Sequence, residues 1–230
     1  MAHYLELDAA RSQHDPLILL VPGLDDGQPQ HWQRLWENQC SDCRRVDFGA
    51  PDNPCRNNWV NRLNLAIHQA GRPVVLVAHG LGCLAVAWWA EYERPEYGNP
   101  VVGALFVAPP DVERPDTDPR LARFASSPRG PMPFPSFLAA SQDDPLCTLR
   151  TAQLLALDWG SRFAFAGAAG GIDGRSGLGD WHFGKKLLAQ LLREHREDIG
   201  RGEPAERFAY PVLPDASHAQ ARLMELVPRH

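Results

Sequence analysis

The sequence has no long apolar run and no block of basic residues. None of its hydrophobic stretches approaches the roughly 20 residues that a membrane-spanning helix needs, which argues against a membrane partner. Lys and Arg number 23 against 28 Asp and Glu, so the formal net charge is −5 and a nucleic-acid partner is not expected. Residues 1–16 lack a basic segment followed by an apolar one, so we predict no secretory signal and a cytoplasmic protein.

Cysteine is also scarce. The chain has five cysteines, and an odd number without a secretion signal predicts reduced thiols. Cys40 and Cys43 form a C-x-x-C pair, with Cys55 downstream. A zinc site would need a fourth ligand at regular spacing, and a redox C-x-x-C usually opens a helix, whereas this one closes a helix-like stretch. We therefore predict neither a metal nor a cofactor.

What is present is an alternation of short apolar runs with helix-like segments. Several of the runs are continuously apolar, which predicts a mostly parallel, doubly wound sheet covered on both faces by helices, a three-layer αβα sandwich. In the helix expected over 57–71, Trp59, Leu63 and Ile67 should face inward, with Leu65 as a further candidate. The expected strands are 16–23, 44–50, 73–79, 101–110, 135–141 and 161–167, and the other expected helices are 29–40, 81–94, 146–160 and 182–197.

The composition changes near the C-terminus. We place one α/β domain over residues 1–196 and a polar, proline-containing extension over 197–230. The sequence leaves open whether the extension packs as an arm, contributes to a homodimer contact or stays mobile. Within the domain, the Pro- and Arg-rich loop 109–135 leaves open whether it forms a lid.

One turn carries the strongest functional signal. The apolar strand ending at His79 is followed by a sharp turn and a helix, and the pentapeptide Ala78-His79-Gly80-Leu81-Gly82 fits the strand-turn-helix pattern G-x-S-x-G except at its third position. A small residue suffices at Ala78, and Gly82 permits close helix–strand packing. The nucleophilic serine of the pattern is replaced by Gly80.

The chain resembles the α/β-hydrolase fold over roughly residues 16–195, and within it the YdeN-like serine hydrolases, the family that includes retinoblastoma-binding protein 9. Four segments carry the resemblance: VPGLDDGQPQHWQRLWE, VLVAHGLGC, ASQDDP and AAGGIDGRSGLGDW. It implies a Ser-His-Asp triad whose nucleophile falls on Gly80, whose acid falls on Asp144 and whose histidine falls on Gly171. Only the acid is retained.

The two glycines predict a loss of triad chemistry, because glycine supplies neither a nucleophile nor a base. We expect a hydrolase-fold protein that binds a small molecule or a protein partner. The backbone N–H groups of Leu24 and Leu81 match the two sides of an oxyanion hole. His31 would stand at the pocket entrance or, equally, in the core. The alternative is an active esterase with a relocated nucleophile or base, for which the candidates are Cys83 and His182.

Local arguments assign roles to four more positions. Glycine at position 80 should relieve the strain that a nucleophile elbow imposes on other residues. Asp144 is expected to cap the helix that begins near Pro145. His79 should point away from Gly80 into packing, and Ser176 reads as a turn serine rather than a nucleophile.

Overall fold

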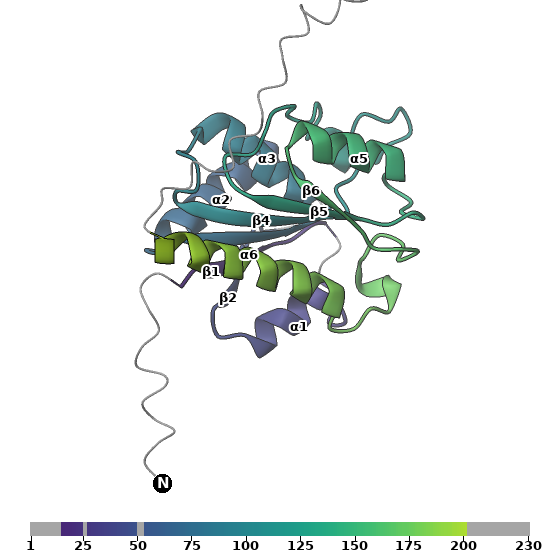
Figure 1. The fold of residues 1–230 in the computed structure, drawn as a ribbon. Helices are drawn as coiled ribbons and strands as arrows, with labels where there is room; N and C mark the ends of the chain where they lie inside the picture. The colour runs from purple at the N-terminus through teal and green to yellow at the C-terminus, as the bar shows by residue number, and fades with distance from the viewer. Residues whose placement is uncertain (1–14, 25–26, 50–52, 202–230) are drawn as a thin grey trace, which may run out of the picture.

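The computed structural model describes residues 15–24, 27–49 and 53–201, so most of the extension expected over 197–230 lies outside the described residues. In this part of the chain six parallel strands form one sheet, ordered β2-β1-β3-β4-β5-β6 (Figure 1). The strands are β1 (Leu17–Val21), β2 (Cys43–Arg45), β3 (Val74–His79), β4 (Val101–Val107), β5 (Ser136–Ala140) and β6 (Arg162–Phe165). The helices are α1 (Trp32–Gln39), α2 (Arg56–Gln69), α3 (Leu81–Glu93), α4 (Pro119–Ala122), α5 (Leu149–Asp158) and α6 (His182–Arg201), with a 3-10 turn at Gly174–Ser176.

The central strand β3 shows why the sheet needs cover on both sides. All six of its residues are buried. Val74, Leu76 and Ala78 join one apolar core, and Val75 and Val77 join the other, as the two-residue period of a strand requires. A strand that is apolar on both faces is stable only between two layers of helices.

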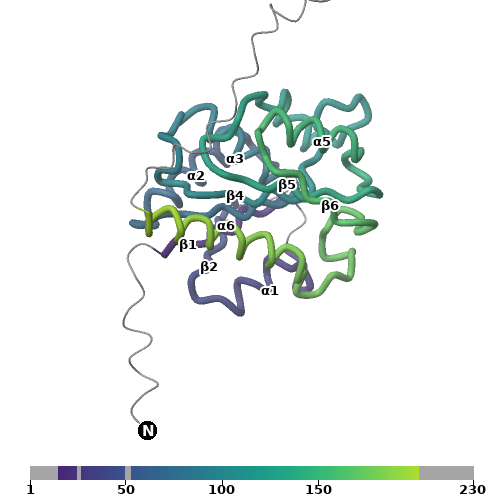
Figure 2. The backbone as a smooth tube through the Cα atoms, viewed as in Figure 1, coloured from purple at the N-terminus to yellow at the C-terminus, as the bar shows by residue number. Residues whose placement is uncertain are grey.

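Those two layers are visible in Figures 1 and 2. Helices α1 and α6 lie on one face of the sheet, and α2, α3 and α5 lie on the other. The expected three-layer, parallel, doubly wound fold is therefore confirmed. No helix among the described residues is long and apolar enough to cross a membrane.

The strand order places a topological switch point between β1 and β3. The chain leaves the carboxyl end of β1 toward α1 on one face, and it leaves the adjacent end of β3 toward α3 on the other. Ligands of open α/β sheets bind where neighbouring strands send their connections to opposite faces. Leu24 follows β1 and Gly80 follows β3, so both residues lie at this switch point.

Gly82 allows α3 to pack closely against the end of β1. A Cβ atom at position 82 would lie 2.5 Å from the carbonyl oxygen of Val21 and 2.6 Å from that of Pro22. Both are backbone atoms, held by the sheet and by the turn that follows it. The packing role expected for this glycine therefore has a definite steric basis.

Several element bounds differ from the sequence expectations: α1 begins at Trp32 rather than at 29, and β4 ends at Val107 rather than at 110. Three further differences have a clear physical cause. Strand β2 ends at Arg45 rather than at 50, because it is an edge strand paired only with β1 and the chain then turns inward to bury Val46 and Phe48. Leu65 is 56% exposed, since it lies about 200° around α2 from the buried Leu63. Helix α5 begins at Leu149, where Thr148 supplies the cap, rather than near 146.

The segment 109–135 packs against the α2–α3–α5 layer. Phe124 and Phe134 are fully buried there. The indole N–H of Trp88 donates to the carbonyl of Phe124, and that of Trp159 donates to the carbonyl of Pro128. Helix α6 continues through the domain boundary expected at 196 and extends to Arg201.

Replacing Gly82 with alanine should destabilise the fold by about 1–3 kcal/mol, because overpacking against backbone that cannot withdraw is costly. The matched control is Gly130→Ala, where a Cβ meets nothing within 4 Å and the change should stay within about 0.5 kcal/mol. Chemical denaturation of both variants measures the difference. Equal stabilities would contradict the steric role of Gly82.

Candidate functional site: an elbow without its nucleophile

Gly80 has the backbone of a strained elbow. Its φ is 52° and its ψ is −126°, and it lies between the end of β3 and the first residue of α3. Its N–H donates to the carbonyl of Val107 on β4 at 2.9 Å, which fixes the turn to the sheet. Residues other than glycine rarely adopt this conformation. The expected relief of strain by glycine therefore matches the observed geometry.

The space at Gly80 is not crowded. A Cβ atom there would meet the Cα of Gly23 at 3.8 Å, which is ordinary van der Waals contact. A serine side chain could thus be carried on this turn without displacing its neighbours. Glycine is favoured here by backbone conformation and not by lack of room.

Leu81 and Leu24, the two residues expected to form an oxyanion hole, follow Gly80 and Gly23, whose backbones lie close together. Leu81 is the first residue of α3, so its N–H is among those at the helix start that have no acceptor within the helix. Gly23 approaches Gly80 from the end of β1, and Leu24 follows it. The positive end of the 13-residue α3 dipole adds to the attraction for a carbonyl oxygen or an anion.

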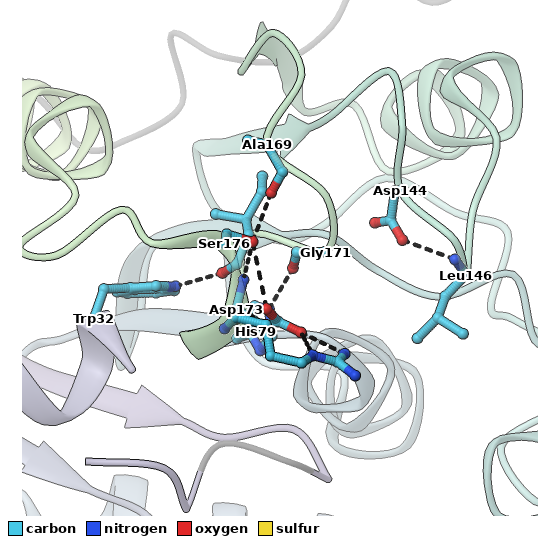
Figure 3. Close-up of polar contacts among 10 residues, drawn as sticks. Trp32, His79, Asp144, Leu146, Ala169, Gly171, Asp173 and Ser176 are labelled. Carbon is cyan, nitrogen blue, oxygen red and sulfur yellow. Dashed lines mark hydrogen bonds and ion pairs between the residues drawn. The ribbon is translucent and has the colours of Figure 1, made fainter. Parts of the chain in front are cut away.

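The loop that contains Gly171 is held firmly although it carries no histidine. The Ala169 N–H donates to Ser141 Oγ at 2.9 Å, and the Gly170 N–H donates to Asp143 Oδ1 at 2.9 Å. From the other side, the indole N–H of Trp32 donates to the carbonyl of Ile172 at 2.8 Å (Figure 3). Both neighbours of Gly171 are therefore fixed by hydrogen bonds.

Gly171 itself has space for a side chain. The nearest atoms to a Cβ at this position are the carboxylate oxygen Oδ2 of Asp173 at 3.5 Å and its Cγ at 3.8 Å. The carbonyl of Gly171 lies 2.9 Å from Nε2 of His79. This position could hold an imidazole next to a carboxylate and a second histidine.

His79 is a packing residue with a specific contact. Its side chain is only 6% exposed, and its ring lies 4.8 Å from that of His31 and 6.0 Å from that of Trp32. It lies on the α1 side of the sheet with Val75 and Val77, as the alternation of β3 predicts. Its bond to Gly171 links the strand before the elbow to the loop of the missing histidine.

Asp144 caps a turn and not a helix. Its Oδ1 accepts a hydrogen bond of 2.8 Å from the N–H of Leu146, and α5 begins three residues later with its own cap at Thr148 (Figure 3). The helix-capping role expected for Asp144 is therefore wrong. The proline at 145 and the short turn that follows it delay the start of the helix.

The two neighbouring carboxylates have opposite environments. Burial raises the pKa of Asp144 to about 6, an effect that the Leu146 N–H and the nearby His79 oppose and Asp173 reinforces. Asp143 is exposed, and hydrogen bonds from the Ser141 hydroxyl and the Gly170 N–H hold the pKa of its carboxyl below the usual range. Asp144 is thus a partly buried acid that interacts electrostatically with His79. Asp143 instead anchors the Gly171 loop.

His31 and Trp32 lie inside the core rather than at an entrance. Their side chains are 0% and 1% exposed. His31 is the N-cap of α1, and its Nδ1 accepts a hydrogen bond from the N–H of Gln33. Of the two roles open for His31, the structure supports the one in the core.

Of the two residues proposed to rescue catalysis, one is in the core and the other is on the surface. Cys83 is completely buried, with its Sγ 3.4 Å from the carbonyl oxygens of Ala78 and Val107. His182 is exposed at the first position of α6. Ser176 binds within its own loop, donating to Ala169 O at 2.7 Å and accepting from the N–H of Asp173. It is the turn serine that the sequence predicts.

Two contributors were missed in the sequence. Gln33 is fully buried, and its Nε2 donates to the carbonyls of Val21 and Val77 at 3.3 and 2.9 Å, which joins the ends of β1 and β3. Asp173 accepts from Arg175 and faces Gly171. A buried glutamine one residue after the aromatic Trp32 gives no distinctive sequence signal. Asp173 was visible only as part of a glycine-rich loop.

The parallel sheet and the strand-turn-helix elbow at Gly80 have the arrangement of an α/β-hydrolase fold. A model of the serine hydrolase family matches residues 18–190. The chain belongs to this family. Comparison with curated proteins gives no match.

Solved structures agree with this assignment. A YdeN-like hydrolase from Pectobacterium atrosepticum is 28% identical with a TM-score of 0.69, over 79% of this chain and 92% of that one. The ydeN gene product of Bacillus subtilis is 17% identical with a TM-score of 0.61, over 77% of this chain and 99% of that one. Est1E from Butyrivibrio proteoclasticus, with ferulic acid bound, shares the fold at 11% identity and a TM-score of 0.57, over 83% and 92%.

Replacing Gly80 with alanine should lower the free energy of unfolding by about 1–2 kcal/mol, because its φ of 52° strains any other residue. Since the added Cβ meets only ordinary contacts, the loss would report on the backbone and not on a clash. Chemical denaturation against Gly130→Ala, at a glycine whose φ is not positive, gives the comparison. An unchanged midpoint would show that the elbow relaxes without cost.

Stability should depend on pH through Asp144. Because the folded-state pKa of about 6 exceeds the ordinary value of 3.8, the folded protein binds more protons between these values. The contribution of Asp144 to the free energy of unfolding therefore falls as the pH rises from about 4 to 6. Asp144→Asn retains an acceptor for Leu146 and should become more stable than the native chain above pH 6, by at most about 3 kcal/mol.

The neighbouring carboxylate provides the control of opposite sign. The lowered pKa of Asp143 means that its charge stabilises the fold at neutral pH and that this contribution is lost only in strong acid. Asp143→Asn should therefore be less stable than the native chain at pH 7. Denaturation curves at pH 4 and pH 7 for both variants decide the matter, and parallel behaviour of the two would refute the assigned environments.

Proposed function

We propose that this protein uses a serine-hydrolase site for binding and does not perform triad hydrolysis. The observation that carries the proposal is Gly80 at the tip of the elbow, with the backbone of a nucleophile and no side chain to attack. The histidine position, Gly171, likewise lacks a base, and the remaining acid, Asp144, bonds to the turn at Leu146. Serine hydrolysis needs an oxygen nucleophile within hydrogen-bond reach of an imidazole.

The ligand class follows from the groups that remain. The N–H groups at the start of α3, beginning with that of Leu81, and the N–H of Leu24 would bind a carbonyl or an anion. An ester, amide or carboxylate could be held there without being cleaved. We propose that the ligand is a small molecule or an exposed carbonyl or carboxylate of a protein partner.

The alternative of a relocated catalytic centre has less support. The Cys83 thiol faces carbonyl oxygens in the core, and His182 is at an exposed helix start. His79 directly precedes Gly80, but its Nε2 is hydrogen-bonded to the carbonyl of Gly171. Residual rate enhancement from an oxyanion hole alone is about 10³–10⁴ over water, far below that of a complete triad.

Restoring the two missing groups tests the proposal. The native chain should hydrolyse short p-nitrophenyl esters at no more than about 10³–10⁴ times the rate in water, the level that an oxyanion hole alone supplies. The double variant Gly80→Ser, Gly171→His should gain at least about 100-fold, because both positions have room and both loops are held. Steady-state rates with acetyl and butyryl esters provide the measurement.

Two controls separate restored chemistry from chance reactivity. Each single substitution should remain near the native level, since neither group acts without the other. Adding Asp144→Asn to the double variant should lower the restored kcat, because the acid no longer stabilises the imidazolium. Turnover by the native chain at an enzymatic rate would refute the proposed loss of catalysis.

A further inference from the structure

The C-x-x-C pair forms a compact turn between α1 and β2. Helix α1 ends at Gln39 with Cys40 as its cap, and β2 begins at Cys43. The Cys43 N–H donates to the Cys40 carbonyl at 3.2 Å, so the four residues close a hydrogen-bonded turn. In such a turn the first and last Cα atoms lie within about 7 Å, and a disulfide requires about 4.4–6.8 Å.

The two side chains also meet. A side-chain hydrogen bond with Cys40 and its charge both contribute to raising the pKa of the Cys43 thiol, as expected of neighbouring thiols. Cys43 is buried at 9% exposure, whereas Cys40 is half-buried. Cys40 is therefore the more accessible of the two to a reagent.

We propose that Cys40 and Cys43 are a reversible thiol–disulfide modification site that ties the end of α1 to the start of β2, with a small-molecule disulfide such as glutathione disulfide as its oxidant. The proposal does not depend on the proposed function, because the turn lies at the amino end of β2, whereas the elbow follows the carboxyl end of β3.

The reaction proceeds in two exchanges. The Cys40 thiolate attacks one sulfur of glutathione disulfide, forming a mixed disulfide and releasing one glutathione. Cys43 then loses its proton and attacks the Cys40 sulfur, which forms the internal disulfide and releases the second glutathione. The two cysteines lose two electrons and two protons in total, and the oxidant becomes two molecules of glutathione.

The surroundings indicate a slow, stable couple rather than a catalytic one. Burial, Cys40 and the carboxylates of Asp42 and Glu37 all raise the pKa of the Cys43 thiol. The pair closes a helix, so no helix N-terminus stabilises a thiolate as in redox enzymes. A poor thiolate is also a poor leaving group, so the disulfide should form slowly and resist reduction.

A metal does not account equally well for the pair. Across residues 15–24, 27–49 and 53–201, no group of three or more His, Cys, Asp or Glu side chains is placed to hold a metal ion. Cys55 lies apart, exposed at the start of α2.

A disulfide between Cys40 and Cys43 would constrain α1, the helix whose tryptophans bind the loop that contains Gly171. Trp36 of α1 donates from its indole N–H to the carbonyl of Asp180 at 2.9 Å, and Trp32 donates to Ile172. Fixing the C-terminal end of α1 limits its fraying and should raise the melting temperature of the whole domain.

Mass spectrometry tests the site on the full chain. The native protein is equilibrated with a series of glutathione and glutathione disulfide ratios, free thiols are blocked with iodoacetamide, and the peptides are mapped. We expect one internal disulfide between Cys40 and Cys43, with the other three of the five cysteines alkylated. Alkylation of all five at every ratio, or a disulfide that instead uses Cys55, would overturn the proposal.

Two variants give the order of the steps. Cys43→Ser should accumulate glutathione on Cys40, and Cys40→Ser should take up little glutathione at position 43. Cys55→Ser is the matched control and should form the internal disulfide as the native chain does. The oxidised native protein should melt a few degrees above its reduced form, with no such shift in Cys40→Ser. Equal melting of fully oxidised and reduced native protein would overturn the stabilising tie.

Discussion

The close approach of helix α3 to the end of β1 is the constraint on which the site depends. Any side chain at Gly82 would collide with the carbonyl oxygens of Val21 and Pro22. That contact sets where α3 begins, and the turn before it must then pass through Gly80 at a positive φ. The elbow is thus produced by packing between a helix and the sheet. It does not require the serine that usually stands at its tip, which explains how the geometry persists without the nucleophile.

The loop of the missing histidine is equally independent of the group it lacks. Indole N–H groups from α1, a hydroxyl from the end of β5, the Asp143 carboxylate and the His79 ring all bind its backbone. Gln33 joins the ends of β1 and β3 beneath it. These hydrogen bonds hold the loop without a side chain at Gly171, and glycine at position 80 avoids backbone strain at the elbow. Such a frame supports the proposal that the protein keeps binding and stability without turnover.

Much of this frame could be predicted from the sequence, since buried parallel strands are continuous apolar runs and the elbow has a fixed glycine spacing. The limits have physical causes. The end of β2 depends on an edge with one neighbour, the exposure of Leu65 depends on its angle around α2, and the role of Asp144 depends on a turn that delays α5 by a few residues. The Gln33 contacts join segments far apart in the chain, and no local pattern encodes them. The family comparison confirms the hydrolase class, and the positions of Gly80 and Gly171 within it come from the motifs.

The central claim is that the site binds without a nucleophile. Its most direct test is exposure of the native chain to a serine-directed fluorophosphonate, followed by intact-mass analysis, with the Gly80→Ser, Gly171→His variant in parallel. Because the native chain lacks a nucleophile at position 80, it should form no adduct, whereas the variant should form one adduct, at position 80. A stoichiometric adduct on the native chain at any residue lining the elbow would contradict this claim, because an activated nucleophile would then be present.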